Sequence, residues 1–379
     1  MMKMKIAIVC YPTFGGSGVM ATELGMSLVN HGHEVHFIAY KKPVRLTDLN
    51  QNLHFHKVNV PDYPLFSFVP YELALSTKLV DVVKNNSIDV LHVHYAIPHA
   101  YAAYMAKKML KEQSINIPIV TTLHGTDITL VGNHPSYKTA VTFSINKSDI
   151  VTCVSQSLKE DTLDQFDIKK EIVVIPNFID ISKYIIQQDL CLHENPIPAK
   201  EFIISHVSNF RPVKNVTNVI KIFYNIQKQL KAQLLMIGEG PEKSVAEDLC
   251  KELGISHLVK FLGNTNQVEK NLCHSDLFLL PSSAESFGLA ALEAMASKVA
   301  VISSNAGGLP EINIDGETGY VEDFDNIDEM SKKAISILSS KEQLDSFKNK
   351  AFLKAKEYDI NNLVPLYEKT YQMALDRIK

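Results

Sequence analysis

The feature that most constrains the fold is an apolar run at residues 277–281, which a turn and a helix-favouring segment follow at once. A short, continuous apolar run is typical of a strand buried on both faces of a parallel sheet. Residues 289–296 are rich in Ala, Leu, Met and Glu, which favour helix. A Ser-rich turn with Gly288 joins the two segments. The pattern therefore predicts a strand, a turn and a helix of an α/β fold.

Two carboxylates frame this turn. Glu285 lies before the helix, and Glu293 lies eight positions later, inside it. If the span were helical, they would be about 12 Å apart along the axis, which is roughly the reach from the ribose of a nucleotide-sugar to its sugar ring. A carboxylate accepts hydrogen bonds from vicinal hydroxyls, and a helix start favours an anion. The alternative is a helix-start charge and a surface residue, but Glu293 stands in an otherwise apolar run.

Composition indicates a soluble globular protein of two or three domains. The chain has 379 residues, of which 46% are hydrophobic and 21% charged. With a net charge of −4, nucleic acid is not expected as a partner. No apolar run approaches the roughly 18–20 residues that span a bilayer, and the apolar segment 6–10 is too short for a signal-peptide core. We therefore expect a cytoplasmic protein without a membrane partner.

Neither the cysteines nor the histidines have the spacing of a disulfide or metal framework. The five cysteines are scattered and include no Cys-x-x-Cys pair, which is typical of a reducing compartment and predicts no disulfide. Four histidines, His92, His94, His99 and His124, lie near predicted strand ends. No Cys or carboxylate lies at a usual ligand spacing from them, so we expect them to make hydrogen bonds and to hold no metal.

The N-terminal half begins with a βαβ unit. An apolar strand at 5–10 leads through a glycine-rich loop at 11–18 into a helix at 19–31 and a second strand at 33–39. The glycines of the loop let the backbone approach a ligand closely. Dinucleotide-binding domains share this pattern, but residues 39–42 read Ala-Tyr-Lys-Lys where a ribose-binding acid is expected. The sequence therefore argues against a nicotinamide cofactor.

Further strand patterns continue the α/β series. They are predicted at 89–94, 117–123, 149–154 and 172–175. The segment 181–200 loses the pattern, and we interpret it as the linker and entry to a second domain. The second series has strands at 201–207, 232–237, 259–263, 277–281 and 299–303. Ligands of open α/β sheets bind at the carboxyl ends of the strands, so we expect the functional residues there.

A turn after the first strand of the second series carries two cations. Arg211 and Lys214 lie three positions apart, at the edge of the sheet where Glu285 is also expected. The planar fork of Arg and the compact charge of Lys suit a diphosphate. From the residues alone, two solvated surface cations remain the alternative.

Several motifs together resemble the retaining glycosyltransferases of family 4. The donor-binding set is matched by Arg211-Pro212-Val213-Lys214-Asn215, Gly238-Glu239-Gly240-Pro241, Glu285 with Glu293, and Gly307-Gly308-Leu309-Pro310-Glu311. The first half adds Gly15-Gly16-Ser17-Gly18, His92-Val93-His94-Tyr95 and His124-Gly125-Thr126-Asp127. The resemblance implies the α/β GT-B fold, with two Rossmann-like doubly wound domains facing a cleft. It places the domains at 1–178 and 179–361, with a C-terminal helix at 362–379 that crosses back to the first domain.

The resemblance also implies an activity. Within the family, it is greatest to members that transfer N-acetylglucosamine from UDP-N-acetylglucosamine to the hydroxyl of L-malate, the first step of bacillithiol biosynthesis. The α configuration of the sugar would be retained. The implied partners are these two small-molecule substrates, with no cofactor and no required metal, and a homo-oligomer is compatible with the sequence.

The same resemblance implies the roles of individual residues. The chemistry is assigned to Arg211, Lys214, Glu285 and His124. Donor binding is assigned to Gly16, Asn209, Arg211, Lys214, Leu262, Gly263, Glu285, Phe287, Gly288, Leu289 and Glu293. Acceptor binding is assigned to Gly15, Gly16, Ser17, Tyr95, Thr126 and Arg211. In this scheme Glu293 binds the ribose, Glu285 faces the sugar, and the two cations stabilise the charge of the leaving diphosphate.

Other activities stay open from the residues alone. Two-carboxylate hydrolysis would need Glu285 and Glu293 to flank a glycosidic bond at about 5–9.5 Å. A nucleotide-sugar epimerase of the same fold would use the same nucleotide contacts, and a transferase to a lipid or another sugar would differ in its acceptor. A noncatalytic sugar-binding protein leaves the phosphate turn unexplained. Asp323-Phe324-Asp325 spells the metal-binding pattern of another transferase fold, but it falls in a predicted solvated turn.

Overall fold

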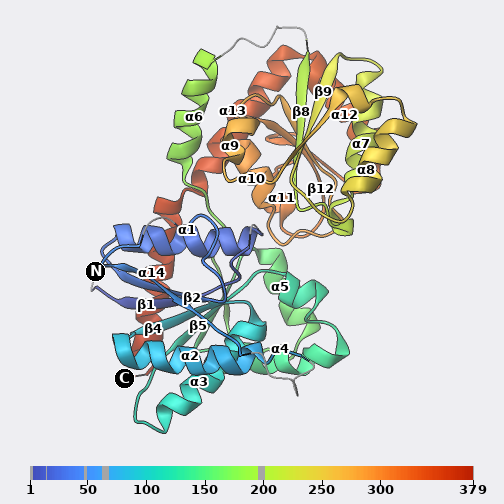
Figure 1. Cartoon of the computed structure of the whole chain (residues 1–379). Coiled ribbons are helices and arrows are strands. Elements are labelled where there is room, and N and C mark those ends of the chain that lie inside the picture. Colours follow the sequence, from blue (N-terminus) through green and yellow to red (C-terminus); the bar gives the residue numbers. More distant parts are fainter. Residues whose placement is uncertain (1–2, 14, 47–48, 62–67, 195–200, 379) are drawn as a thin grey trace. The chain divides into compact units, whose positions relative to one another are not determined.

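The computed structural model describes residues 3–13, 15–46, 49–61, 68–194 and 201–378, and the chain forms two α/β units (Figure 1). Unit 1 comprises Met1–Asn177 and Ile360–Lys379, and unit 2 comprises Phe178–Asp359. The chain therefore leaves unit 1 once and returns to it with its last helix. The domain limits expected from the sequence differ from these bounds by at most two residues. The first segment of unit 1 was expected to end at residue 178 and ends at 177, and its last helix was expected to begin at 362, whereas the second segment begins at 360.

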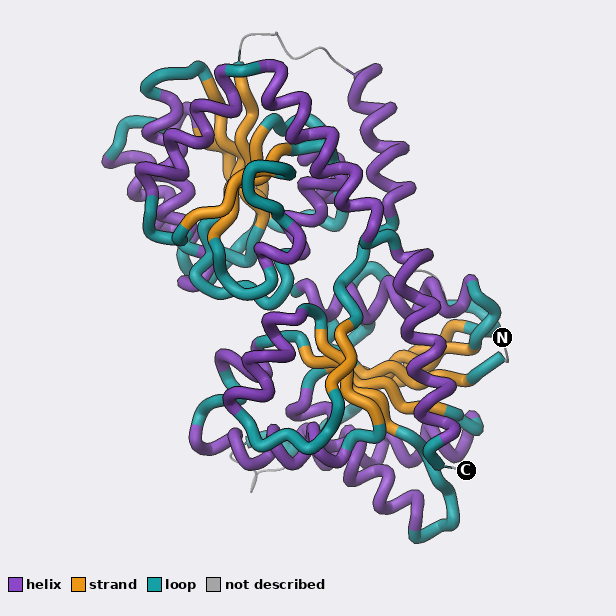
Figure 2. Tube along the Cα trace, turned by 180° about the vertical axis from the view of Figure 1, so that it is seen from behind, coloured by secondary structure: helices purple, strands orange, loops and turns teal. Residues whose placement is uncertain are grey.

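The described part of unit 1 is built on a seven-stranded parallel sheet with the order β3-β2-β1-β4-β5-β6-β7. The strands are β1 Lys5–Val9, β2 Glu34–Ala39, β3 Leu53–Lys57, β4 Val90–His94, β5 Ile119–Leu123, β6 Ile150–Cys153 and β7 Ile172–Val174. Every residue of β4 and β5 is buried, because helices cover both faces of the sheet (Figure 2). This burial explains the continuous apolar runs of the central strands.

Helices and two short π-type turns complete unit 1. They are α1 Gly16–Asn30, α2 Tyr71–Asn86, η1 Ala96–Ala100, α3 Tyr101–Lys111, η2 Thr126–Leu130, α4 Pro135–Lys147, α5 Gln156–Gln165 and α14 Ile360–Asp376. On one face of the sheet, Ile38 and Val93 pack with Leu79 of α2 and Ala103 of α3. The last helix, α14, contacts α1, β4 and β5, so the C-terminal helix is part of unit 1.

Unit 2 has a six-stranded parallel sheet with the order β10-β9-β8-β11-β12-β13 among its described residues. The strands are β8 Phe202–Val207, β9 Ala232–Ile237, β10 Val259–Gly263, β11 Leu277–Leu280, β12 Ala300–Ser304 and β13 Gly319–Glu322. The helices are α6 Ile181–Glu194, η3 Pro212–Lys214, α7 Val216–Gln227, α8 Lys243–Glu252, η4 Ser256–Leu258, α9 Val268–Leu272, α10 Leu289–Ala296, α11 Leu309–Ile312, α12 Ile327–Ser339 and α13 Lys341–Glu357. Leu277 and Leu279 pack with Phe223 of α7 in the core.

Two local predictions from the sequence are wrong, and two strands were not predicted. Helix α1 begins at Gly16 and not near residue 19, so Gly16, Ser17 and Gly18 belong to the helix and not to the loop. The segment read as a linker forms helix α6, which buries Tyr184, Gln187 and Cys191 at helical spacing. Strand β3 at one edge of the unit 1 sheet and strand β13 at one edge of the unit 2 sheet were not predicted, because short edge strands lack a continuous apolar run.

The prediction of no disulfide is also wrong. Cys191 and Cys273 are bonded, with their Cα atoms 6.4 Å apart and 82 positions between them in sequence. Helix α6 packs against α9, which brings the two residues together. Cys10, Cys153 and Cys250 are buried and are not disulfide-bonded. Linear spacing could not reveal the pair, because Cys191 lies in α6 and Cys273 directly follows α9.

Among the described residues, no helix is both long and apolar enough to cross a bilayer.

Candidate active site

The turn after β8, which carries the two predicted cations, is held by a chain of hydrogen bonds. The buried His206 ring contacts the Leu279 carbonyl through Nδ1 at 2.8 Å and the Ser208 hydroxyl through Nε2 at 2.8 Å. The same hydroxyl accepts the Phe210 N–H at 3.2 Å. Burial lowers the pKa of His206 to about 4, so the ring is neutral, Nδ1–H donates and Nε2 accepts. The backbone that leads into Arg211 is therefore fixed by neutral hydrogen bonds.

A second turn, at Gly238, packs directly against this segment. Gly238 has φ +125°, and a Cβ there would lie 1.8 Å from the Ser208 carbonyl oxygen, so only glycine fits. Its N–H donates to the Gly263 carbonyl at 2.8 Å. The Gly238-Glu239-Gly240-Pro241 motif thus supports the segment that leads into Arg211 and connects it to the end of β10.

The predicted cations and the predicted sugar-binding acid meet at adjacent strand ends. Lys214 Nζ forms an ion pair with Glu285 Oε1, and the two side chains are only 17% and 14% exposed. The Asn215 amide donates to the Pro281 carbonyl at 2.9 Å, which attaches the turn to the end of β11. Arg211 is exposed on the same turn and makes no ion pair within the described residues. The alternative of two solvated surface cations is therefore wrong for Lys214.

The loop after β12 fixes the backbone of Glu285. Gly307 has φ +55°, and a Cβ there would lie 1.8 Å from the Glu285 carbonyl oxygen. The Gly308 N–H donates to the same oxygen at 3.0 Å. The close approach explains the glycine at position 307 of the Gly307-Gly308-Leu309-Pro310-Glu311 motif.

Helix α10 begins beside Glu285 with its backbone donors available. Gly288 is the N-cap with φ +97°, no side chain of the described residues caps the helix, and its first turn has no acid. Such a start favours an anion next to Leu289. Glu293 is 8% exposed within the helix, so it is not a solvated surface residue. Phe287 is buried against the Tyr358 ring, with ring centroids 5.7 Å apart.

The remaining predicted donor residues lie at two strand ends. Leu262 is 44% exposed at the end of β10, although it is apolar. Gly263 follows it with φ +71°. Asn209 is exposed directly after β8. Because Gly263 is bonded to the Gly238 turn, these residues belong to the same edge of the unit 2 sheet as Arg211.

In unit 1, three predicted acceptor residues from three strand ends form one hydroxyl cluster. The Tyr95 hydroxyl lies 2.6 Å from Ser17 Oγ. Burial raises the pKa of Tyr95 to about 12, although hydrogen bonds with Ser17 and Thr126 lower it in part. Tyr95 has φ +85°, an unusual conformation for a non-glycine residue that is often found at functional sites.

The start of α1 adds backbone donors to unit 1. Gly15 is the N-cap and Gly16 the first helical residue. No described side chain caps this helix, and no acid lies in its first turn. An anion would therefore be favoured beside Gly15 and Gly16.

The four histidines singled out in the sequence, His92, His94, His99 and His124, make hydrogen bonds to one another, to hydroxyls or to a backbone carbonyl. His124 Nε2 lies 2.7 Å from His94 Nδ1, and its ring lies 5.2 Å from that of Tyr95. Burial, together with a smaller effect of the nearby His99, lowers the pKa of His124 to about 3. His124 is therefore neutral near physiological pH and contributes hydrogen bonds, not positive charge. His92 contacts the Tyr371 hydroxyl of α14 at 2.8 Å.

Asp127 is a buried residue of this edge that was not among the predicted site residues. One carboxylate oxygen accepts the Ala96 N–H at 2.8 Å, and the other accepts the Gly125 N–H at 3.1 Å. Burial raises the pKa of Asp127 to about 6, although these hydrogen bonds lower it in part. Asp127 thus joins the loops after β4 and β5, which carry Tyr95 and Thr126. Its place at the end of the His124-Gly125-Thr126-Asp127 motif was the available signal.

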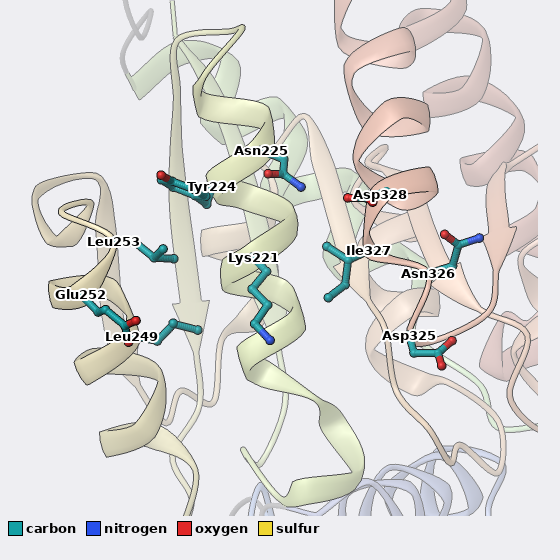
Figure 3. Close-up of a pocket in the computed structure, with 10 residues that line it drawn as sticks. All are labelled: Lys221, Tyr224, Asn225, Leu249, Glu252, Leu253, Asp325, Asn326, Ile327 and Asp328. Carbon is teal, nitrogen blue, oxygen red and sulfur yellow. The ribbon is translucent and has the colours of Figure 1, made fainter.

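A pocket of about 530 Å³ in unit 2 lies between α7, α8 and the start of α12 (Figure 3). Lys221, Leu249 and Asp325 are among its lining residues. None of the predicted donor residues lines it. Asp325 belongs to the Asp323-Phe324-Asp325 run, which is an exposed turn directly before α12, as the sequence predicted.

Two family models match the chain and together cover most of it. The model described as Glycosyltransferase Family 4 matches residues 14–183, and the model described as Glycosyl transferases group 1 matches residues 189–354. The N-acetyl-alpha-D-glucosaminyl L-malate synthase of Bacillus anthracis is 45% identical over 342 residues, which cover 90% of this chain and 89% of the relative.

Solved structures share the fold along the whole chain. The sucrose-phosphate synthase of Thermosynechococcus elongatus has a TM-score of 0.79 at 18% identity, covering 99% of this chain and 100% of that one. An Anabaena protein in complex with UDP and glucose has a TM-score of 0.76 at 19% identity, covering 97% of this chain and 99% of that one. At such identities the likeness shows the fold alone, and this fold is GT-B, with two parallel-sheet Rossmann-like domains.

Proposed function

The chain belongs to glycosyltransferase family 4, and we propose that it transfers N-acetylglucosamine from UDP-N-acetylglucosamine to the hydroxyl of L-malate. The observation that carries the proposal is the 45% identity, over 90% of this chain, with a relative whose name states that product. Unit 2 supports the donor half of the reaction, and unit 1 supports the acceptor half.

The donor half rests on the residues at the carboxyl edge of the unit 2 sheet. Arg211 and Lys214 offer two cations to the diphosphate, and the start of α10 offers backbone N–H groups. Glu293 is buried within α10, where a carboxylate can accept both ribose hydroxyls. Glu285 lies against Lys214, so the sugar that it binds is adjacent to the phosphate that Lys214 binds.

The transfer step needs charge stabilisation more than a protein nucleophile. The bond between the sugar C1 and the diphosphate oxygen breaks while a bond from C1 to the malate hydroxyl oxygen forms. Negative charge develops on the leaving diphosphate, and Arg211 and Lys214 stabilise it. The hydroxyl proton of malate passes to a leaving phosphate oxygen, so no general base from the protein is required and the atoms balance.

Two finer points of the mechanism are part of the proposal. The α configuration is retained, because the acceptor attacks from the side on which the diphosphate leaves. Catalysis needs no metal, because Arg211, Lys214 and the helix start supply the positive potential that a metal would otherwise supply. The resemblance to retaining members of the family supports both points.

The acceptor half rests on unit 1. L-Malate is a dianion with a hydroxyl, so its site needs donors for carboxylates and partners for a hydroxyl. The start of α1 at Gly15 and Gly16 supplies backbone donors, and Ser17, Tyr95 and Thr126 supply hydroxyls. Arg211, which is exposed and lacks an ion-pair partner among the described residues, is the cation that we assign to malate as well as to the donor.

The test is an acceptor panel with the purified chain and UDP-N-acetylglucosamine. The panel contains L-malate, D-malate, a neutral sugar, phosphatidylinositol vesicles and no acceptor. We expect UDP release that depends on L-malate, a product with the mass of N-acetylglucosaminyl malate, and an α-anomeric proton by NMR. Turnover should survive removal of metals with EDTA.

Each other product identifies a different function. A glycolipid or a disaccharide would overturn the acceptor assignment. A changed UDP-sugar without any acceptor would identify an epimerase, and free N-acetylglucosamine would identify a hydrolase. A β-linked product would contradict retention, and loss of turnover with EDTA that Mg²⁺ restores would contradict metal independence.

A further inference from the structure

A cluster of one glutamate and three histidines lies on β2 and the edge strand β3 of unit 1. Glu34 and His36 are alternate residues of β2, so their side chains share one face of the sheet. His54 pairs directly with His36 in the parallel register of β2 and β3, and His56 follows two positions later. The fold therefore gathers four potential metal ligands at one edge. The activity proposed above uses none of them.

Three of these side chains converge on one point. His36 Nε2 lies 3.0 Å from Glu34 Oε1, and His54 Nε2 lies 3.7 Å from the same oxygen. All three ligand atoms lie within 4.8 Å of one another. A tetrahedral zinc ion with bonds of about 2.0–2.1 Å holds its ligand atoms roughly 3.3–3.4 Å apart. The distances to Glu34 bracket this value, so small side-chain movements complete the geometry.

We propose that Glu34, His36 and His54 form a zinc site that fastens the edge strand β3 to β2. Two imidazole nitrogens and one carboxylate oxygen are a frequent zinc ligand set, with water in the fourth position. His54 is 34% exposed on its side chain, which leaves a path to solvent for the ion and its water.

The neighbouring residues set the orientation that the ligands need. His36 Nδ1 lies 2.9 Å from His56 Nε2, so Nδ1–H donates to His56 when Nε2 binds the metal. Lys5 Nζ lies 3.2 Å from Glu34 Oε2, which leaves Oε1 for the ion. His54 exchanges its contact with the Gln51 carbonyl, at 3.2 Å, for the metal and turns from its stack on His36.

The consequence is structural. Strand β3 is the last strand of the sheet on this side, so only β2 holds it by backbone hydrogen bonds within the described residues. A metal bridge between His36 and His54 adds a second connection between the two strands. Zinc should therefore stabilise unit 1 without entering the transfer reaction, and the proposal does not rest on the substrate assigned above.

The test is a zinc titration of the full chain by calorimetry near neutral pH. Reductant is left out, so that the Cys191–Cys273 disulfide stays closed and offers no thiolates. The variants are His54→Ala and Glu34→Gln, and His257→Ala is the control, because His257 is exposed and lies in unit 2. Circular dichroism checks that each variant is folded. Co²⁺ replaces zinc in a parallel experiment that reports coordination geometry.

We expect the wild type and His257→Ala to bind one more zinc ion than His54→Ala and Glu34→Gln, or to bind it at least about tenfold more tightly. Co²⁺ should give tetrahedral d–d absorption in the wild type, and zinc should raise its melting temperature. The proposal is overturned if the wild type binds no zinc, if either ligand variant binds like the wild type, or if Co²⁺ gives only the spectrum of the hydrated ion.

Discussion

Lys214 and Glu285 form an ion pair, although 71 positions separate them in sequence. Lys214 ends the turn after β8, and Glu285 lies in the loop after β11, which is the neighbouring strand. The pair places the cation that we assign to the phosphate and the carboxylate that we assign to the sugar hydroxyls side by side on one sheet edge. A nucleotide-sugar has the same order of groups, since its diphosphate is bonded directly to its sugar.

Replacing Lys214 tests the phosphate assignment. Lys214→Ala should lower kcat/KM for UDP-N-acetylglucosamine. The loss of transition-state stabilisation should be on the order of 2–4 kcal/mol, because a charge-assisted contact with the leaving diphosphate is lost. Steady-state kinetics with saturating L-malate measures this. Lys251→Ala is the matched control, since Lys251 is an exposed lysine of α8 with its own ion pair to Asp248. Equal kinetics for both variants would reject the phosphate role.

Replacing Glu285 separates sugar binding from phosphate binding. Glu285→Gln keeps the shape of the side chain but removes the charge that pairs with Lys214. UDP, which lacks the N-acetylglucosamine group, should therefore bind as tightly as before or more tightly, while kcat with UDP-N-acetylglucosamine falls. Calorimetry with UDP and turnover assays measure the two effects. Weaker UDP binding in this variant would place Glu285 on the nucleotide instead.

The ribose assignment of Glu293 is tested by removing first the Glu293 carboxylate and then the 2′-hydroxyl of the ribose. Glu293→Ala should lower kcat/KM for UDP-N-acetylglucosamine. The lost transition-state stabilisation should be on the order of 2–4 kcal/mol, because a buried charge-assisted contact is lost. The 2′-deoxyribose analogue of the donor should show a similar defect with the wild type and little further loss with the variant. Additive losses would show that Glu293 acts elsewhere.

The pH dependence of stability reports the neutral ring of His206. In the unfolded chain His206 has its usual pKa of 6.5 and takes up a proton when the pH falls below that value. In the folded chain its pKa is about 4. Between these values the unfolded state binds more protons, so the free energy of unfolding falls as pH falls. The slope is about 1.4 kcal/mol per pH unit for this one ring.

His206→Gln isolates that contribution, because Gln can donate to the Leu279 carbonyl and accept from Ser208 but does not titrate. Urea unfolding between pH 4 and 6.5 should show a shallower loss of stability in the variant than in the wild type. Parallel curves for the two proteins would mean that His206 is charged in the folded state.

Reducing the disulfide should destabilise unit 2. The bond closes a loop of 82 positions, and cross-links of this kind typically contribute about 2–4 kcal/mol by restricting the unfolded chain. Thermal unfolding with and without dithiothreitol measures this. Cys273→Ser is the control, since its melting temperature should be low in both conditions. A wild type insensitive to reductant would show that Cys191 and Cys273 do not need to be bonded.

Much of the fold could be predicted from the sequence, because parallel strands buried on both faces leave continuous apolar runs. The run 277–281 became β11, and the Ala-rich segment after it became α10. Strand β3 was missed because its sequence Leu-His-Phe-His-Lys alternates, as an edge strand with one covered face does. Helix α6 was missed because Gln187 is buried in it, and a buried Gln weakens the apolar pattern.

Candidate site residues could be predicted where a charged side chain is itself part of a motif. Lys214 and Glu285 were identified from their charges and their places after strands. The supporting contacts could not be predicted, because they depend on distances between loops that are remote in sequence. The Gly238 turn beneath Ser208 is one example, and Asp127 between two loops is the other. The disulfide of Cys191 belongs to the same class of long-range contact.

A crystal structure of the chain with UDP-N-acetylglucosamine tests the central claim most directly. The account predicts the diphosphate on Arg211, Lys214 and the start of α10, with the ribose hydroxyls on Glu293. A nucleotide bound elsewhere, for example in the pocket between α7, α8 and α12, with Arg211 and Glu293 left without ligand, would contradict it.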